Sequence, residues 1–238
     1  MNTRSQSENG WNRSNQSQHL NKPLNIQIQN KNLLIPTHFQ PDYKPVPNPD
    51  AVVKAPNLRI TVLTTKLLRI EYCTTDQFED RPSQPIWYRN LPVPEFDSKI
   101  NKTASARGYQ ETLTVTTSEM ILNVAIGEAP SPETLYIYMF SMDRTWHFKD
   151  INHGNLKGTY RTLDTFNGRV PLEEGLISRD GWAVIDDSKS LVFNSQGWLE
   201  PRNSQPGDLD LYFFGYGHDY QSCISDYRTI TGPVPLLP

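Results

Sequence analysis

Cysteine is scarce in this chain, long apolar runs are missing, and there is no excess of basic charge. Two cysteines among 238 residues exclude a disulfide-dense secreted scaffold and a four-thiolate zinc site. No apolar run approaches the roughly 20 residues that a membrane-spanning helix needs, which argues against a membrane protein. The net charge of −3 provides no basic field that would hold nucleic acid. Hydrophobic residues make up only 36%, so part of the chain is expected to lie outside any core.

The first residues also lack a secretory signal, which would need a basic start followed by an apolar stretch. Residues 1–24 are rich in Asn, Gln and Ser and cannot bury enough surface to offset the entropy of ordering. We predict a disordered polar tail here and a cytoplasmic location. Cys73 and Cys223 are then expected to be reduced thiols that pack as small apolar groups, with a disulfide between them as the second interpretation.

Residues 25–56 are predicted to form an extended, proline-rich lead-in. The prolines from Pro36 to Pro56 each lack an N–H and fix φ, so neither a helix nor a central strand fits this segment. A proline-rich recognition peptide is the functional alternative, but Pro45-Val46-Pro47 lacks a basic flank.

Residues 57–217 contain several short stretches with strand periodicity or strand length. Apolar and polar residues alternate over 58–62 and 68–72, with a polar turn between them that indicates a hairpin. Further stretches occur at 112–117, 120–126, 135–140, 181–185, 190–193 and 209–214. Because no helical pattern separates them, we predict an all-β fold, an antiparallel β-sandwich of two packed sheets, with a closed barrel as the second architecture.

Residues 218–238 contain one well-specified helix. Asp219 is placed to cap its start, and Gly232 followed by Pro233 is placed to end it. One apolar stripe is expected at i, i+3, i+4 and i+7: Tyr220, Cys223, Ile224 and Tyr227. The apolar ending after Gly232 leads us to expect that the sequence continues as a linker into a further domain.

Four segments carry a resemblance to a known family: NLKGTYRTLD at 155–164, PLEEGLISRDGWAVIDDS at 171–188, DLYFFGYGHDY at 210–220 and TGPVPLLP at 231–238. In this order they resemble the N-terminal region of glycoside hydrolase family 31, the α-glucosidase and α-xylosidase family. The resemblance is close from about residue 155 to 238, looser back to about residue 58, and does not cover the first fifty residues.

The resemblance implies a β-sandwich similar to the galactose mutarotase fold, followed by a (β/α)8 barrel that holds both catalytic aspartates. This sequence ends where that barrel would begin. The resemblance therefore implies a carbohydrate substrate of the α-glucoside type and a partner barrel, downstream or on another chain. No catalytic residue, and no hydrolysis by this chain alone, is expected. A free-standing carbohydrate-binding module is the alternative function, and a purely structural sandwich is the third.

The stretch between Arg161 and Trp182 holds the candidate substrate contacts. Its carboxylates and arginines suit paired sugar hydroxyls, and a Trp face can pack on a pyranose ring. By resemblance, Asp164 is the first candidate, followed by Asp180, Trp182 and Arg161. The competing interpretation is that salt bridges of Arg161, Asp164, Arg179 and Asp180 hold the loop on the domain and that Trp182 belongs to the core.

No acid/base pair, metal site or cofactor site is apparent. A retaining glycosidase needs two carboxylates about 5–5.5 Å apart across the scissile bond. Neighbouring strand residues face opposite sides, so Glu173-Glu174 and Asp186-Asp187 are poorly placed for this, and the second pair is typical of a turn. The acidic and histidine residues between Asp143 and His153 match no standard metal spacing. Gly215-Tyr216-Gly217 lacks the third glycine of a dinucleotide loop.

Overall fold

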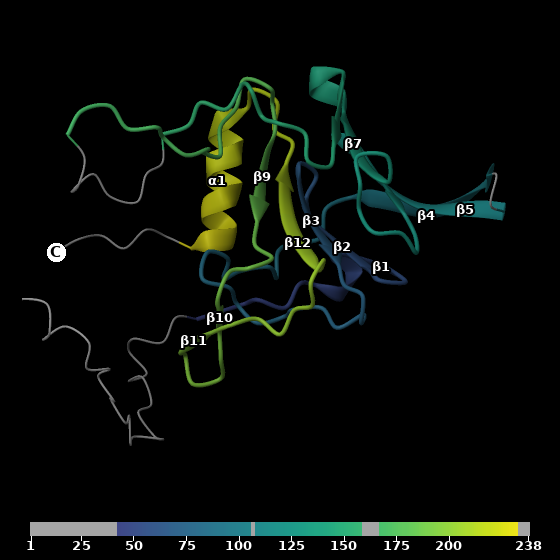
Figure 1. Cartoon of the computed structure of the whole chain (residues 1–238), viewed down its shortest axis with the longest axis horizontal. Helices are drawn as coiled ribbons and strands as arrows, with labels where there is room; N and C mark the ends of the chain where they lie inside the picture. The colour runs from purple at the N-terminus through teal and green to yellow at the C-terminus, as the bar shows by residue number, and fades with distance from the viewer. Residues whose placement is uncertain (1–41, 106–107, 159–166, 233–238) are drawn as a thin grey trace, which may run out of the picture. The chain divides into compact units, whose positions relative to one another are not determined.

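The computed structural model describes residues 42–105, 108–158 and 167–232 (Figure 1). The predicted tail over 1–24, the first part of the lead-in and the apolar ending lie outside these residues, as do the candidates Arg161 and Asp164. Across the described ranges, none of the helices combines the length and the apolar character needed to cross a bilayer.

The predicted antiparallel sandwich is confirmed: the described residues form two five-stranded sheets. The first sheet has the order β1 (Val52–Ala55), β2 (Leu58–Thr64), β3 (Leu67–Tyr72), β12 (Leu209–Phe214) and β9 (Ala183–Asp186). The second sheet runs in chain order through β4 (Phe96–Ser105), β5 (Gly108–Thr117), β6 (Met120–Ala125), β7 (Leu135–Met139) and β8 (Arg144–His147). Smaller elements are the β10 (Val192–Phe193) and β11 (Leu199–Glu200) pair and the 3-10 helices η2 (Pro49–Ala51) and η3 (Phe140–Met142).

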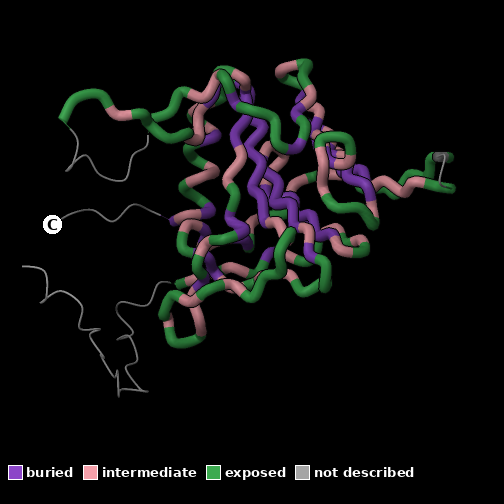
Figure 2. Tube along the Cα trace, viewed as in Figure 1, coloured by how far each residue is buried: buried purple, intermediate pink, exposed green. Residues whose placement is uncertain are grey.

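The main core lies between the two sheets, because alternate strand residues point to the same face. In β2, Leu58, Ile60 and Val62 all contribute to this core, and β5 and β6 supply its other side. Phe213 in β12 is fully buried there and stacks against Trp146 of β8, with ring centroids 4.9 Å apart. Figure 2 shows buried residues running along the strands of the first sheet.

The outer face of the first sheet is covered by α1 (Tyr220–Thr231), which lies beside β9 and β12 in Figure 1. The predicted caps are present: the Asp219 carboxylate accepts the Ser222 N–H at 3.2 Å, and Gly232 ends the helix at φ +89°. Cys73 and Cys223 are free and buried, as expected for packed thiols.

The predicted apolar stripe of this helix was partly wrong. Ile224 is 51% exposed, whereas Cys223 and Ile230 are buried against the sheet with Tyr227 beside them. These three residues are spaced i, i+4 and i+7, so the buried face is centred about 100° away from Ile224.

Two further features differ from the sequence expectation. The predicted stretches at 181–185 and 190–193 contain β9 and β10, but these strands belong to different sheets, since β9 pairs with β12 while β10 pairs with β11. The ten-residue strand β4 was not predicted, since most of its residues are polar and exposed. The first sheet begins at β1, inside the proline-rich segment, as an edge strand that needs no second partner.

Candidate functional site

The loop that carries the predicted site residues leaves and rejoins the sandwich at a fixed base. The Leu156 N–H donates to the Ile177 carbonyl at 2.9 Å, and the Arg179 N–H donates to the Gly154 carbonyl at 2.8 Å. The Asn155 side chain ties Gly175 twice: its amide donates to the Gly175 carbonyl at 2.8 Å and its carbonyl accepts the Gly175 N–H at 2.9 Å. The stretch between residues 156 and 174, which contains Arg161 and Asp164, is thus joined to the sandwich at both ends.

Asp180 is part of this base. Its Oδ2 accepts the Gly154 N–H at 2.8 Å, and its Oδ1 pairs with Arg144 at 3.0 Å. The Gly154 N–H, together with the Arg144 guanidinium, lowers the pKa of Asp180 below its usual value. Gly154 has no space for a side chain, since a Cβ there would lie 2.7 Å from the Asp180 nitrogen. Asp180 therefore holds the loop base with its carboxylate.

Two of the motif segments, far apart in sequence, meet beside this base. The Gly217 N–H donates to the Gly181 carbonyl at 2.9 Å, and His218 Nε2 lies 2.9 Å from the Arg179 carbonyl. Gly181 adopts φ +78°, and a Cβ on it would lie 2.8 Å from Met142 Cγ. A larger residue at position 181 would therefore be strained and would push the segments apart.

Trp182 lies in the core, with 5% of its surface exposed. Its ring centroid is 6.1 Å from that of Trp146, and its backbone carbonyl accepts the Asn152 amide at 2.8 Å. Trp182 also lines a cleft of about 340 Å³, together with Trp146 and Glu174. The sequence analysis did not select Trp146, because nothing in its local pattern separates it from a core residue.

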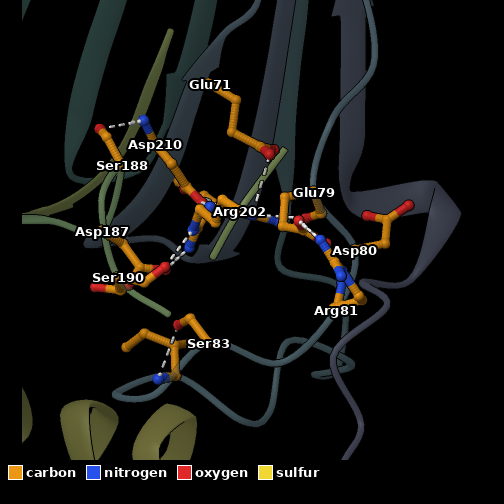
Figure 3. Close-up of polar contacts among 12 residues, drawn as sticks. Glu71, Glu79, Asp80, Arg81, Ser83, Asp187, Ser188, Ser190, Arg202 and Asp210 are labelled. Carbon is orange, nitrogen blue, oxygen red and sulfur yellow. Dashed lines mark hydrogen bonds and ion pairs between the residues drawn. The ribbon is translucent and has the colours of Figure 1, made fainter. Parts of the chain in front are cut away.

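The buried ionic groups lie elsewhere, on the outer face of the first sheet (Figure 3). Strand register places Arg59 opposite Glu71 and Glu71 opposite Asp210. Arg59 binds both oxygens of Glu71 at 2.6 and 2.8 Å, and Arg69 binds both oxygens of Asp210 at 2.8 Å. All four side chains are almost fully buried.

Arg202 extends the cluster from the segment that covers this face. It donates to Asp210 at 2.7 Å and also to Asp187, which is itself fully buried. Figure 3 shows Arg202 between these two carboxylates, with Ser188 and Ser190 beside them. The sequence analysis noted the alternating polar positions of the strands but did not predict that a covering segment buries them.

The pKa values of the cluster acids follow from burial and from their partners. Burial raises the pKa of Glu71 and of Asp187 above the ordinary values. Burial acts on Asp210 in the same sense, but Arg69 and Arg202 outweigh it and hold the pKa of Asp210 well below its usual range. The adjoining cavity, lined by Glu71, Asp210 and Cys73 among others, measures about 170 Å³, which is below the range of about 300–1,000 Å³ typical of ligand pockets.

The adjacent acids Asp186 and Asp187 have separate environments. Asp186 accepts the Ser188 N–H at 3.0 Å, as a turn residue does, while Asp187 is buried beside Arg202. The two carboxylates therefore do not face one cleft as a pair. Among the described residues, no group of three or more histidine, cysteine or acidic side chains is arranged to hold a metal ion.

No protein-family model matches the chain, and no curated protein matches it. Among solved structures, it is similar to a GH31 dextranase of Flavobacterium johnsoniae, in a variant complexed with isomaltotriose, at 15% identity and a TM-score of 0.43 over 79% of this chain. A second structure of that enzyme, complexed with glucose, gives 14% identity and a TM-score of 0.42 over 76% of this chain. The chain spans about a quarter of the dextranase, 27% and 26% of the two chains.

Proposed function

We propose that this chain is the N-terminal β-sandwich of a family 31 glycosidase that acts on α-linked glucosides. Its loop supplies one wall of the substrate pocket, and a (β/α)8 barrel downstream or on another chain supplies the catalytic aspartates. The proposal is supported chiefly by the convergence of the motif segments: Arg179 and Gly181 contact Gly217 and His218, and Asn155 and Asp180 fix the loop between them.

Within this proposal the candidate residues have different roles. Asp164 and Arg161 would contact sugar hydroxyls from the loop, through charge-assisted hydrogen bonds. Asp180 would act as a positioning residue, since its carboxylate is engaged with Gly154 and Arg144. Trp182 would contribute packing under the loop, because this residue is 95% buried.

The environments of the described carboxylates support placing catalysis in a second domain. The acids with raised pKa values, Glu71 and Asp187, are enclosed with arginines, where no glycosidic bond can reach them. Asp186 accepts the Ser188 N–H within a turn. The sandwich would thus position substrate while the barrel performs the double displacement of a retaining glycosidase.

The test is hydrolysis of a chromogenic α-glucoside with and without the protein encoded directly downstream of Pro238. The purified chain alone should give no turnover, and hydrolysis should appear when a barrel is supplied. Asp164→Asn should then lower kcat/KM by roughly ten- to a hundredfold, the value of one hydrogen bond to a charged group. Glu128→Gln, an exposed change in the connection between β6 and β7, is the matched control.

Turnover by the lone chain at ordinary enzyme rates, on the order of 1–10³ s⁻¹, would contradict the missing-barrel assignment. A two-domain enzyme that is indifferent to Asp164→Asn would contradict the pocket-wall assignment. The alternative function, a free-standing carbohydrate-binding module, would give saturable glycan binding with no dependence on any barrel.

A further inference from the structure

Two positions near the loop base carry a glycine directly after an acid or an amide. Among the described residues, glycine follows asparagine only at Asn167-Gly168 and follows aspartate only at Asp180-Gly181. At such a pair the glycine nitrogen is well placed to attack the side-chain carbonyl carbon of the residue before it, because glycine has no Cβ to hinder the approach. The two pairs have the same chemistry available, so their surroundings decide which of them reacts.

The Asn167-Gly168 pair lies in open surroundings. Both residues are exposed, and Gly168 adopts φ +110°. A Cβ added to Gly168 would meet no heavy atom within 4 Å. Within the described ranges, no hydrogen bond engages the Asn167 side chain or the Gly168 N–H. Nothing described here therefore opposes a small movement that brings the Gly168 nitrogen to within the roughly 3–3.5 Å of Asn167 Cγ at which a bond can form.

The Asp180-Gly181 pair is held in the opposite way. The Gly181 N–H donates to the Ser178 carbonyl at 3.2 Å, and Gly181 is buried. The Asp180 carboxylate accepts the Gly154 N–H with one oxygen and pairs with Arg144 through the other. Attack of the Gly181 nitrogen on Asp180 Cγ would first have to break these contacts, which adds their free energy to the barrier.

We propose that Asn167 is a site of spontaneous deamidation and that the fold protects Asp180-Gly181 from the corresponding isomerisation. The Gly168 nitrogen attacks Asn167 Cγ, so that a new C–N bond closes a cyclic imide. The original C–N bond of the side-chain amide breaks, and the nitrogen leaves as ammonia with the proton that Gly168 gives up. Water then opens the imide at either carbonyl and yields aspartate or isoaspartate. Water is the only co-reactant, and nothing is oxidised or reduced.

The modification changes the loop chemically. Either product replaces a neutral amide by a carboxylate, and isoaspartate also lengthens the backbone by one atom at position 167. The chain is thus expected to exist in a younger amide form and an older, more acidic form. An effect of this charge on sugar binding would rest on the proposed function, because Asp164 belongs to the same loop. The modification itself does not rest on it.

The first test follows the full chain during storage in a mildly alkaline buffer. Trypsin releases residues 162–169, in which Asn167 is the only asparagine, so a mass gain equal to the exchange of NH for O assigns the reaction to this residue. Asn203 is the comparison within the same chain, since it is exposed but is followed by Ser204. Asn167 should convert at least about tenfold faster, a barrier difference of about 1.4 kcal/mol. Equal rates at the two asparagines overturn the proposal.

The second test asks whether the fold protects Asp180. Isoaspartate at position 180 is measured by fragmentation of the tryptic peptide 180–189, from the folded chain and from the chain kept in urea. Isomerisation should be slow in the folded chain and should accelerate in urea, where the contacts of Asp180 and Gly181 are lost. Asn167 should convert at similar rates in both conditions. Isomerisation of Asp180 that is as fast in the folded chain as in urea overturns the protection, and conversion of Asn167 only in urea overturns the open site.

Two variants check the assignment. Asn167→Gln should remove the acidic form that accumulates on ion-exchange chromatography, because attack on a longer side chain needs a larger ring. Asn203→Gln, the matched control, should leave that form unchanged, and Asn167→Asp should elute from the start where the aged parent elutes. An acidic form that accumulates equally in Asn167→Gln overturns the site. All these readouts use the chain alone, so their failure leaves the hydrolysis test intact, and failure of that test leaves the modification unaffected.

Discussion

At the scale of single residues, the role of a polar side chain in this domain depends on which segment covers it. Arg59, Arg69 and Glu71 occupy alternate strand positions that would face water in a one-sided sheet. The covering segment with Arg202 removes that water, and each charge is retained because it has an opposite charge within hydrogen-bond distance.

Asp210→Asn should therefore destabilise the domain strongly. The change leaves Arg69 and Arg202 buried without their full countercharge, which costs about 3–5 kcal/mol for buried ion pairs. Urea denaturation of the full chain measures this as a lower midpoint. Asp97→Asn, on an exposed strand residue, should stay within about 0.5 kcal/mol of the parent. Equal midpoints for the two variants would show that the cluster adds nothing to stability.

Asp180 should make stability depend on pH in the acid range. Because its folded-state pKa is lowered, it stabilises the fold above its usual pKa of 3.8, and this contribution disappears as the pH falls from there through the folded-state value. Asp180→Asn should thus lower Tm at pH 6, and the difference from the parent should narrow below about pH 3.8. A Tm difference that is constant from pH 6 to pH 2.5 would contradict the ionised role of Asp180.

At the scale of elements, the loop base is a small hydrogen-bonded unit that belongs to neither sheet. The Asn155 side chain binds Gly175, which is 20 positions away in the sequence, and the Asp180 carboxylate binds Gly154, which is 26 positions away. Such a base fixes where the loop begins and ends, whatever conformation its middle adopts. The loop base therefore holds both ends of the loop at fixed positions on the sandwich.

Asn155→Ala should loosen this base without unfolding the sandwich. Two hydrogen bonds to Gly175 are lost, a net cost of about 1–3 kcal/mol that falls mainly on the loop. Trypsin should cut faster at the exposed Lys157 and Arg169, and the Gly175 amide should exchange faster. Asn90→Ala, an exposed asparagine elsewhere, should leave both rates unchanged. Unchanged cleavage in Asn155→Ala would mean that the backbone contacts alone hold the base.

At the scale of the described domain, the features of interest lie where separate parts of the chain come together. The cleft needs Trp146 from one sheet and Val184 and Asp186 from the other. The ionic cluster needs three strands and a covering segment. The hydrolysis test requires a still larger unit, because the buried acids Glu71, Asp187 and Asp210 are engaged with arginines of this domain.

Strand and helix predictions succeeded where one face of an element is buried. The alternation over 58–62 and 68–72 was sufficient for β2 and β3, and Asp219 and Gly232 bracketed α1 correctly. They failed where pairing rather than burial creates the strand, as in β4, whose polar residues carry no periodic signal. The predicted buried face of α1 included Ile224, which is exposed, because the helix pattern alone does not specify which of its sides the sheet covers.

The amino-acid sequence by itself determined the strand-rich fold class, the helix boundaries and the family resemblance, since these depend on local periodicity, capping and motif order. Tertiary structure alone decided that Asp180 pins a loop, that Glu71 and Asp210 are buried beside arginines, and that Trp146 lines a cleft. The physical reason is that burial and partner choice depend on segments distant in sequence, which only packing brings together.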